Sequence, residues 1–318
     1  MPDEPVPIIA VSLNAAVDRT LEAPGLAIGG HVRGRLLSIQ PAGKAVNVAR
    51  LLGTLGRPCV LTGFVGQGDR DRFKESFKRT RVRVEMFEGR GPTRENITLI
   101  DPARGVETHV RDEGFPLADD DLERIKKKLA ILAAPGAYVI FAGSLPPDLT
   151  AEAFGRLLAC GRQRGARLAL DSSGPGLEPV RRGQPVWLVK PNRDELADLA
   201  GRDVRTEADV RAAAEALRGR AEIVVVTLGE GGACAFGPEG AWRAVPHSDP
   251  DAVVNTVGAG DGLLAGFIHA HAGGADLAEC LRRGVATGTA ATHKVRSGVV
   301  DPADAEACYR QVDLAPLG

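Results

Sequence analysis

The chain has 318 residues, of which 44% are hydrophobic and 25% charged, as in an ordinary globular protein. Forty basic against forty-one acidic residues give a formal charge of −1, which argues against a nucleic-acid-binding surface but allows a local phosphate pocket. There is no run of eighteen apolar residues and no basic leader, so we expect no membrane contact and a cytoplasmic location. The five cysteines are scattered, which indicates neither a disulfide framework nor a zinc site.

The first third of the chain predicts two buried strands, at residues 8–13 and 59–64, and a helix that starts after Gly43 and stops at Gly56. Residues 69–80 form a charged stretch that we interpret as a solvated helix. Residues 92–101 alternate polar and apolar side chains and return through residues 106–111, which is typical of a hairpin. We expect small-sheet strands within residues 14–40 and 92–112, with one face that needs a cover.

From residue 118 onward, helices and apolar runs alternate. Helices are predicted at residues 119–132, 151–164 and 277–293, and strands at residues 137–142, 167–171, 186–189 and 222–227. This order favours β-α-β crossovers and a largely parallel sheet, in which ligands bind at the carboxyl ends of the strands. No repeat or linker divides the chain, so we expect a single domain over residues 1–318.

A glycine-rich turn at residues 255–267 leads directly into an apolar helix. Gly258, Ala259 and Gly260 carry almost no side chain, so their backbone N–H groups can approach an anion beside the positive end of the helix dipole. Asp261 follows in the first helical turn. It is either a helix-capping residue or an acid held rigidly beside the anion.

Two other polar pairs also have a structural interpretation. Lys44 and Asn47 lie three residues apart on one helix face, where they either hold hydroxyls or a phosphate, or are simply solvated. Asn192 and Glu195 have the spacing of a capping box at the start of a helix. The glycines at 63, 66 and 68 do not follow the dinucleotide-binding spacing, and Gly43-Lys44 does not follow that of a Walker A loop.

Eight segments, in chain order, resemble the ribokinase/PfkB family of sugar kinases. They are Asn14–Asp18, Gly43–Asn47, Gly63–Gly66, Thr93–Asn96, Gly143–Pro146, Lys190–Glu195, Thr227–Gly229 and Gly258–Asp261. The resemblance implies a ribokinase-like three-layer α/β/α fold with a mostly parallel central sheet and a small β-sheet lid. It also implies an ATP-dependent kinase that uses Mg²⁺.

Within this family the chain is most similar to the branch that phosphorylates fructose 1-phosphate at its C6 hydroxyl. Kinases that phosphorylate C1 of tagatose 6-phosphate or fructose 6-phosphate are close alternatives. A non-catalytic sugar-phosphate sensor remains a more distant one. Because one face of the small sheet needs a cover, we expect a homodimer in which a second copy packs against the lid.

The resemblance also implies the role of each site residue. Asp261 acts as the general base, and Gly258, Ala259 and Gly260 hold the transferring phosphoryl group. The sugar phosphate is bound by Asp18, Gly43, Lys44, Asn47, Arg94, Asn96 and Ser144. ATP is contacted by Lys190, Asn192, Thr227, Gly229, Gly232 and Gly258, and Mg²⁺ is held through water by Asn192 and Glu195.

Several positions depart from the family pattern. Ala15 replaces a usual proline, and Phe141-Ala142 replaces a usual Ser-Gly. Ala45 replaces a usual glycine beside Lys44, and we expect its methyl group to narrow the sugar pocket. Gly262 replaces a usual serine or alanine.

Overall fold

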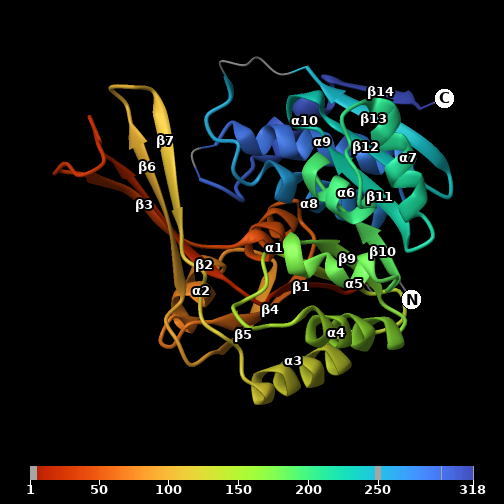
Figure 1. Cartoon of the computed structure of the whole chain (residues 1–318), viewed down its shortest axis with the longest axis horizontal. Coiled ribbons are helices and arrows are strands. Elements are labelled where there is room, and N and C mark those ends of the chain that lie inside the picture. The colour runs from red at the N-terminus through yellow and green to blue at the C-terminus, as the bar shows by residue number, and fades with distance from the viewer. Residues whose placement is uncertain (1–5, 248–251, 295, 318) are drawn as a thin grey trace.

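A computed structural model describes residues 6–247, 252–294 and 296–317 (Figure 1). Its central sheet contains parallel strands in the spatial order β5 (Val82–Glu88), β4 (Cys59–Val65), β1 (Ile8–Ser12), β8 (Tyr138–Ala142), β9 (Arg167–Asp171), β10 (Val186–Val189) and β11 (Ala221–Thr227). Beyond β11 the sheet continues through three antiparallel strands, β12 (Ala233–Gly237), β13 (Gly240–Pro246) and β14 (Val312–Pro316).

Helices cover both faces of this sheet. One face packs against α1 (Lys44–Thr54), α2 (Arg70–Ser76), α8 (Ala259–His271), α9 (Leu277–Thr292) and α10 (Pro302–Tyr309). The other packs against α3 (Asp119–Leu132), α4 (Ala151–Gln163), α5 (Glu178–Arg181), α6 (Arg193–Ala200) and α7 (Glu207–Leu217). Side chains alternate along β1, so that Ile8 and Ala10 enter the first core while Ile9 and Val11 enter the second. The predicted three-layer fold is confirmed.

A separate four-stranded sheet projects from this body, on the left of Figure 1. Its strands lie in the order β3 (Arg35–Ala42), β2 (Ala16–Glu22), β6 (Arg94–Asp101) and β7 (Val106–Arg111), and we call this sheet the lid. The β2–β6 pair is parallel and the two outer pairs are antiparallel. Both edge strands expose large apolar side chains, namely Leu36, Leu37, Ile39, Val106 and Val110.

Helices α8 and α9 pack unusually closely, through glycines. A Cβ atom on Gly262 would lie 2.9 Å from the Gly288 Cα, and one on Gly266 would lie 2.6 Å from the Arg283 carbonyl oxygen. A Cβ atom on Gly284 would similarly lie 2.9 Å from the Leu263 carbonyl oxygen. These contacts explain why the chain has glycine at position 262, where larger residues are usual, because the two backbones touch there.

Several elements differ from the sequence prediction. Strand β5 was not predicted, because Arg83 and Glu85 interrupt its apolar pattern at the edge of the sheet. The short terminal elements α10 and β14 were not predicted, and neither was β2 as a strand of its own. Ala45 does not narrow a pocket, since its side chain is fully buried in the core beneath α1.

Candidate active site

Polar residues gather where the parallel strands end. Asn14 and Ser144 follow β1 and β8, Asp171 ends β9, Lys190 follows β10, and Thr227 ends β11. Because the carboxyl ends of parallel strands meet at one edge of a sheet, these residues form the floor of a common cleft. The lid and the start of α8 lie over the same edge, so segments far apart in the sequence line one site.

The glycine-rich turn begins α8 with unusual backbone geometry. Gly258 is the residue before the helix and has a φ of 92°, in the left-handed region that favours glycine. No side chain caps this helix, so the first-turn amides are available to a ligand. One of the expected amides is partly engaged, because the N–H of Ala259 donates to the carbonyl of Thr256 at 3.3 Å. A Cβ atom on Gly260 would lie 3.2 Å from the Lys190 Nζ, so a cation adjoins this turn.

Asp261 is not a helix cap in this structure. Its side chain is only 5% exposed and accepts a hydrogen bond of 2.9 Å from Asn47 Nδ2, so α1 positions the acid carried by α8. Burial, together with the negative charge of Asp171, raises the pKa of Asp261 to about 7, while Asn47 and the two nearby lysines oppose the rise. The carboxylate can therefore take up and release a proton near neutral pH.

Asp171 is a polar residue of the site that was not predicted from the sequence. Its carboxylate is fully buried between two ammonium groups, with Lys44 Nζ at 2.8 Å and Lys190 Nζ at 3.1 Å. Burial opposes its ionisation, but Lys190 and Lys44 outweigh that effect and hold its pKa below the usual value. Its position at the end of an apolar run was the available signal, because residues at that end of a parallel strand face the ligand site.

A pocket of about 530 Å³ lies between the lid and this floor. It is lined by every residue that we predicted to bind the sugar phosphate, namely Asp18, Gly43, Lys44, Asn47, Arg94, Asn96 and Ser144. Gly258, Gly260 and Asp261 complete its inner end. Asn96 Nδ2 donates to Asp18 Oδ1 at 2.9 Å across the β2–β6 pair, and Ser297 Oγ donates to Asp18 Oδ2 at 3.3 Å. We call this the sugar-side pocket.

A second pocket of about 610 Å³ adjoins the first. It contains most of the residues predicted to contact ATP: Asn192, Thr227, Gly229 and Gly232 line it, together with Ala259. Val253, Leu263 and Val285 give it an apolar wall. Lys190 and Gly258 differ from the prediction, since they line the sugar-side pocket instead. Thr256 and Gly260 line both pockets, so the start of α8 is their shared boundary.

Asn192 and Glu195 form a reciprocal capping box at the start of α6. The Asn192 side chain accepts from the Glu195 amide at 2.8 Å, and the Glu195 Oε2 accepts from the Asn192 amide at 2.8 Å. The other carboxylate oxygen of Glu195 makes no hydrogen bond to the described residues. Glu195 is also near enough to Lys44 to contribute to raising the pKa of that lysine.

These oxygens fit a magnesium ion that keeps most of its waters. In the described part of the chain no three His, Cys, Asp or Glu side chains are grouped as a metal cage. Mg²⁺ is commonly bound by one or two protein oxygens, its own waters and substrate phosphates.

Residues 10–303 match the model of the pfkB family carbohydrate kinases. The chain belongs to this family. It is 35% identical to the 1-phosphofructokinase of Rhodobacter capsulatus over 312 residues, 98% of each chain. It is 30% identical to the ATP-dependent 6-phosphofructokinase isozyme 2 of Escherichia coli (strain K12) over 289 residues, 90% of this chain and 93% of the relative.

Solved PfkB-family structures agree in fold. The phosphofructokinase-2 of Escherichia coli in complex with potassium superposes with a TM-score of 0.90 at 29% identity, over 96% of this chain and 98% of the other. A possible 1-phosphofructokinase from Thermotoga maritima gives a TM-score of 0.85 at 26% identity, over 98% and 99% of the two chains. The protein is therefore a PfkB carbohydrate kinase with the ribokinase-like fold.

In the part of the chain that the structure describes, no helix is both long and apolar enough to cross a bilayer.

Proposed function

We propose that this kinase transfers the γ-phosphoryl group of ATP to the free C6 hydroxyl of fructose 1-phosphate. The observation that carries the proposal is the position of Asp261. Its carboxyl group lies at the inner end of the sugar-side pocket, one residue after the boundary shared with the second pocket. An acceptor hydroxyl in the first pocket and a γ-phosphate in the second would therefore meet beside it. The similarity to several bacterial 1-phosphofructokinases over nearly the whole chain supports the choice of substrate.

The lid side of the sugar-side pocket suits a phosphate ester. Arg94 donates only to backbone carbonyls, those of Asn14 at 3.1 Å and Asp112 at 3.3 Å, and among the described residues it has no carboxylate within 4.0 Å. Arg111, at the end of β7, lines the same pocket and is likewise unpaired in the described structure. Two guanidinium groups without counter-ions can bind a phosphate through paired hydrogen bonds. Arg111 is an addition to the residues predicted from the sequence.

In the reaction that we propose, Asp261 accepts the proton of the C6 hydroxyl. The oxygen of that hydroxyl attacks the γ-phosphorus of ATP. The bond from that phosphorus to the β-phosphate bridging oxygen breaks, and ADP leaves. The amides of the α8 turn and the Lys190 ammonium lie where charge develops on the migrating group. A positioned base contributes roughly 10²- to 10⁴-fold, so these charges and dipoles supply most of the acceleration. Magnesium, held through water by Asn192 and Glu195, would neutralise charge on the phosphates of ATP.

The acid limb of the pH–rate profile tests the base. Asp261 accepts a proton only when ionised, and its pKa is raised to about 7. We expect kcat/KM to rise with pH through about 7 and to level off above it, because that parameter reports groups of the free enzyme. Initial rates between pH 5.5 and 9 at constant ionic strength would measure the profile. A rate that is constant from pH 5.5 to 8 would rule out a base with this pKa.

A second candidate is transfer to C1 of a 6-phosphate ketose. The relative named ATP-dependent 6-phosphofructokinase isozyme 2 favours it, at 30% identity. A panel of fructose 1-phosphate, fructose 6-phosphate and tagatose 6-phosphate, assayed with ATP with and without Mg²⁺, separates the two. We expect the highest kcat/KM for fructose 1-phosphate and no turnover without Mg²⁺. Preference for a 6-phosphate would identify the second candidate, and no turnover of any ketose phosphate would favour a non-catalytic sensor.

We also propose that the lid mediates a homodimer. Its two edge strands expose five large apolar side chains, which a second copy of the lid would remove from water. Ile39→Glu on β3 is expected to shift the protein to monomer at micromolar concentration, as measured by light scattering. Ile131→Glu is the matched control, since Ile131 is 79% exposed on α3, outside the lid. A wild-type monomer, or equal behaviour of the two variants, would contradict the lid interface.

A further inference from the structure

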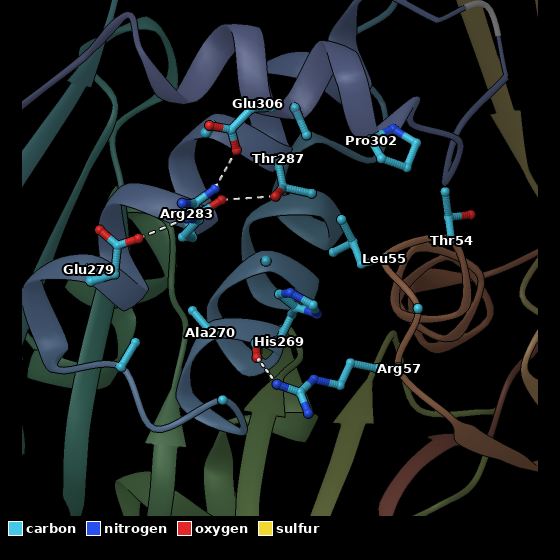
Figure 2. A pocket seen from close by; sticks show the side chains of 16 residues that line it. Thr54, Leu55, Arg57, His269, Ala270, Glu279, Arg283, Thr287, Pro302 and Glu306 are labelled. Carbon is cyan, nitrogen blue, oxygen red and sulfur yellow. Dashed lines mark hydrogen bonds and ion pairs between the residues drawn. The ribbon is translucent and has the colours of Figure 1, made fainter.

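A third pocket, of about 580 Å³, lies outside the site described above (Figure 2). It is enclosed by the last residues of α1 and the loop after it, the second half of α8, and the facing sides of α9 and α10. None of its lining residues lines the sugar-side pocket or the pocket beside it. Its volume is within the range of roughly 300–1,000 Å³ that small-molecule sites occupy.

Two arginines reach this pocket, and only one of them has carboxylate partners. Arg283 on α9 is held between Glu279 and Glu306, each at 2.7 Å, as Figure 2 shows. Arg57, in the loop after α1, donates a single hydrogen bond of 3.1 Å, from Nη2 to the carbonyl of His269. Among the described residues it has no carboxylate within 4.0 Å, and its Nε is buried without a partner. A partly buried guanidinium lacking a counter-ion is costly, so Arg57 is short of an anion.

His269 adds a second group without a partner. Its ring lies beside the Arg57 guanidinium in Figure 2, and its Nδ1 is buried with no hydrogen bond to the described residues. Burial, followed by the charges of Arg57 and Arg283, lowers its pKa, so the ring is neutral at pH 7 and does not add to the positive charge there. The nearby hydroxyls of Thr54 and Thr287 each donate to a carbonyl of their own helix, and in the described structure neither accepts from Arg57.

We propose that this pocket is a second ligand site, in which Arg57 binds the oxyanion group of a small carboxylate or phosphate compound. The planar fork of a guanidinium matches both kinds of oxyanion through two parallel hydrogen bonds. The carboxylates of Glu279 and Glu306, which line the opposite side, would accept from hydroxyl or amino groups at the other end of such a ligand. The ligand would contact α8 near His269, eight residues or roughly 12 Å along the helix from Asp261.

The test compares two arginine substitutions that change the net charge equally. Arg57→Gln removes the proposed anion-binding group, while Arg79→Gln, at an exposed residue after α2 that makes no interaction in the described structure, is the control. The thermal midpoint of each protein is measured against inorganic phosphate and, separately, malonate, with chloride keeping the ionic strength constant. Any binding to the active site is common to all three proteins, so it cancels in the comparison.

We expect Arg57→Gln to need at least roughly tenfold more anion than wild type or Arg79→Gln for the same stabilisation, since one charged hydrogen-bonding group is lost. An effect with phosphate alone identifies the ligand as a phosphate compound, and one with malonate alone as a carboxylate. Equal responses of Arg57→Gln and Arg79→Gln to both anions would overturn the proposal.

A second measurement does not depend on the folding of Arg57→Gln. In ¹⁵N-histidine-labelled wild-type protein, the His269 ring signal, assigned by its loss in His269→Asn, should shift during the anion titration. If that signal stays fixed up to saturation of the thermal effect, the anion binds elsewhere and the proposal fails. Turnover of Arg57→Gln without added anion should match wild type, which would verify that the variant is folded.

Discussion

Asp261→Asn is expected to lower kcat by about 10²- to 10⁴-fold while leaving the affinities for ATP and the sugar phosphate nearly unchanged. The amide keeps the size of the carboxylate, and its oxygen can still accept the hydrogen bond from Asn47 Nδ2. What it loses is the capacity to take a proton from the acceptor hydroxyl. Steady-state rates and isothermal titration of each substrate measure the two halves of this prediction.

The same variant should be more stable than wild type in alkaline conditions. The pKa of Asp261 is raised in the fold from 3.8 to about 7, so ionising this carboxyl group opposes folding as pH rises above 4, and the cost is complete above 7. Removing the charge should therefore raise the free energy of unfolding at pH 8 by up to about 4 kcal/mol, with a smaller gain at pH 5. Asp203→Asn, on a highly exposed side chain, is the control for the stability measurement.

For the activity prediction, weak ligand binding by Asp261→Asn, or full activity, would be incompatible with a proton-accepting role.

Asp171→Asn is expected to destabilise the fold by about 3–5 kcal/mol, measured by denaturant unfolding at pH 8. The carboxylate is fully buried, and its removal leaves the Lys190 ammonium, which is only 5% exposed, without its partner. An exposed ion pair gives a matched comparison: Asp203, paired with Arg205, should cost less than about 1 kcal/mol when replaced by asparagine. Equal losses from the two substitutions would mean that the Asp171 pair contributes no more than a surface contact.

Asp171→Asn should also move the acid limb of the rate profile to lower pH. The negative charge of Asp171 is the second cause of the raised pKa of Asp261, after burial, so its removal lowers that pKa. Phosphate esters themselves titrate near pH 6, but that titration is the same for both enzymes. A difference in pH between the two acid limbs therefore reports an ionisation of the protein and not of the substrate. If the acid limb does not move, the ionisation seen in the rate profile is not that of Asp261.

The sequence was most informative where one local pattern determined the structure. The parallel strands at residues 167–171 and 186–189 have an uninterrupted apolar interior, and they appear with their predicted bounds. Strand β5 was missed because an edge strand tolerates charges such as Arg83 and Glu85, so its pattern resembles a solvated helix. The predicted sugar-side residues do share one pocket, because the lid, the loops after β3 and β8 and the start of α1 all meet there.

Interactions between distant segments could not be read from the sequence. The carboxylate of Asp171 is paired with lysines that lie 127 positions before it and 19 after it, and only the fold brings them together. Asn47 was expected to meet the sugar, and its side chain also donates to Asp261, the proposed general base, on a helix 214 residues away. Arg57, which has no carboxylate partner among the described residues, resembles any surface arginine until α8 is seen to pack beside it.

The glycine contacts between α8 and α9 restrict how this enzyme can close. Backbones that touch at Gly262, Gly266 and Gly284 leave no room for one helix to slide or tilt against the other. The amides and acid at the start of α8 are thus a stationary reference for the chemistry. We therefore expect that the sugar is enclosed by displacement of the four lid strands toward α8. When free and ligand-bound structures are superposed on α9, we expect α8 to keep its position and β6 and β7 to be displaced.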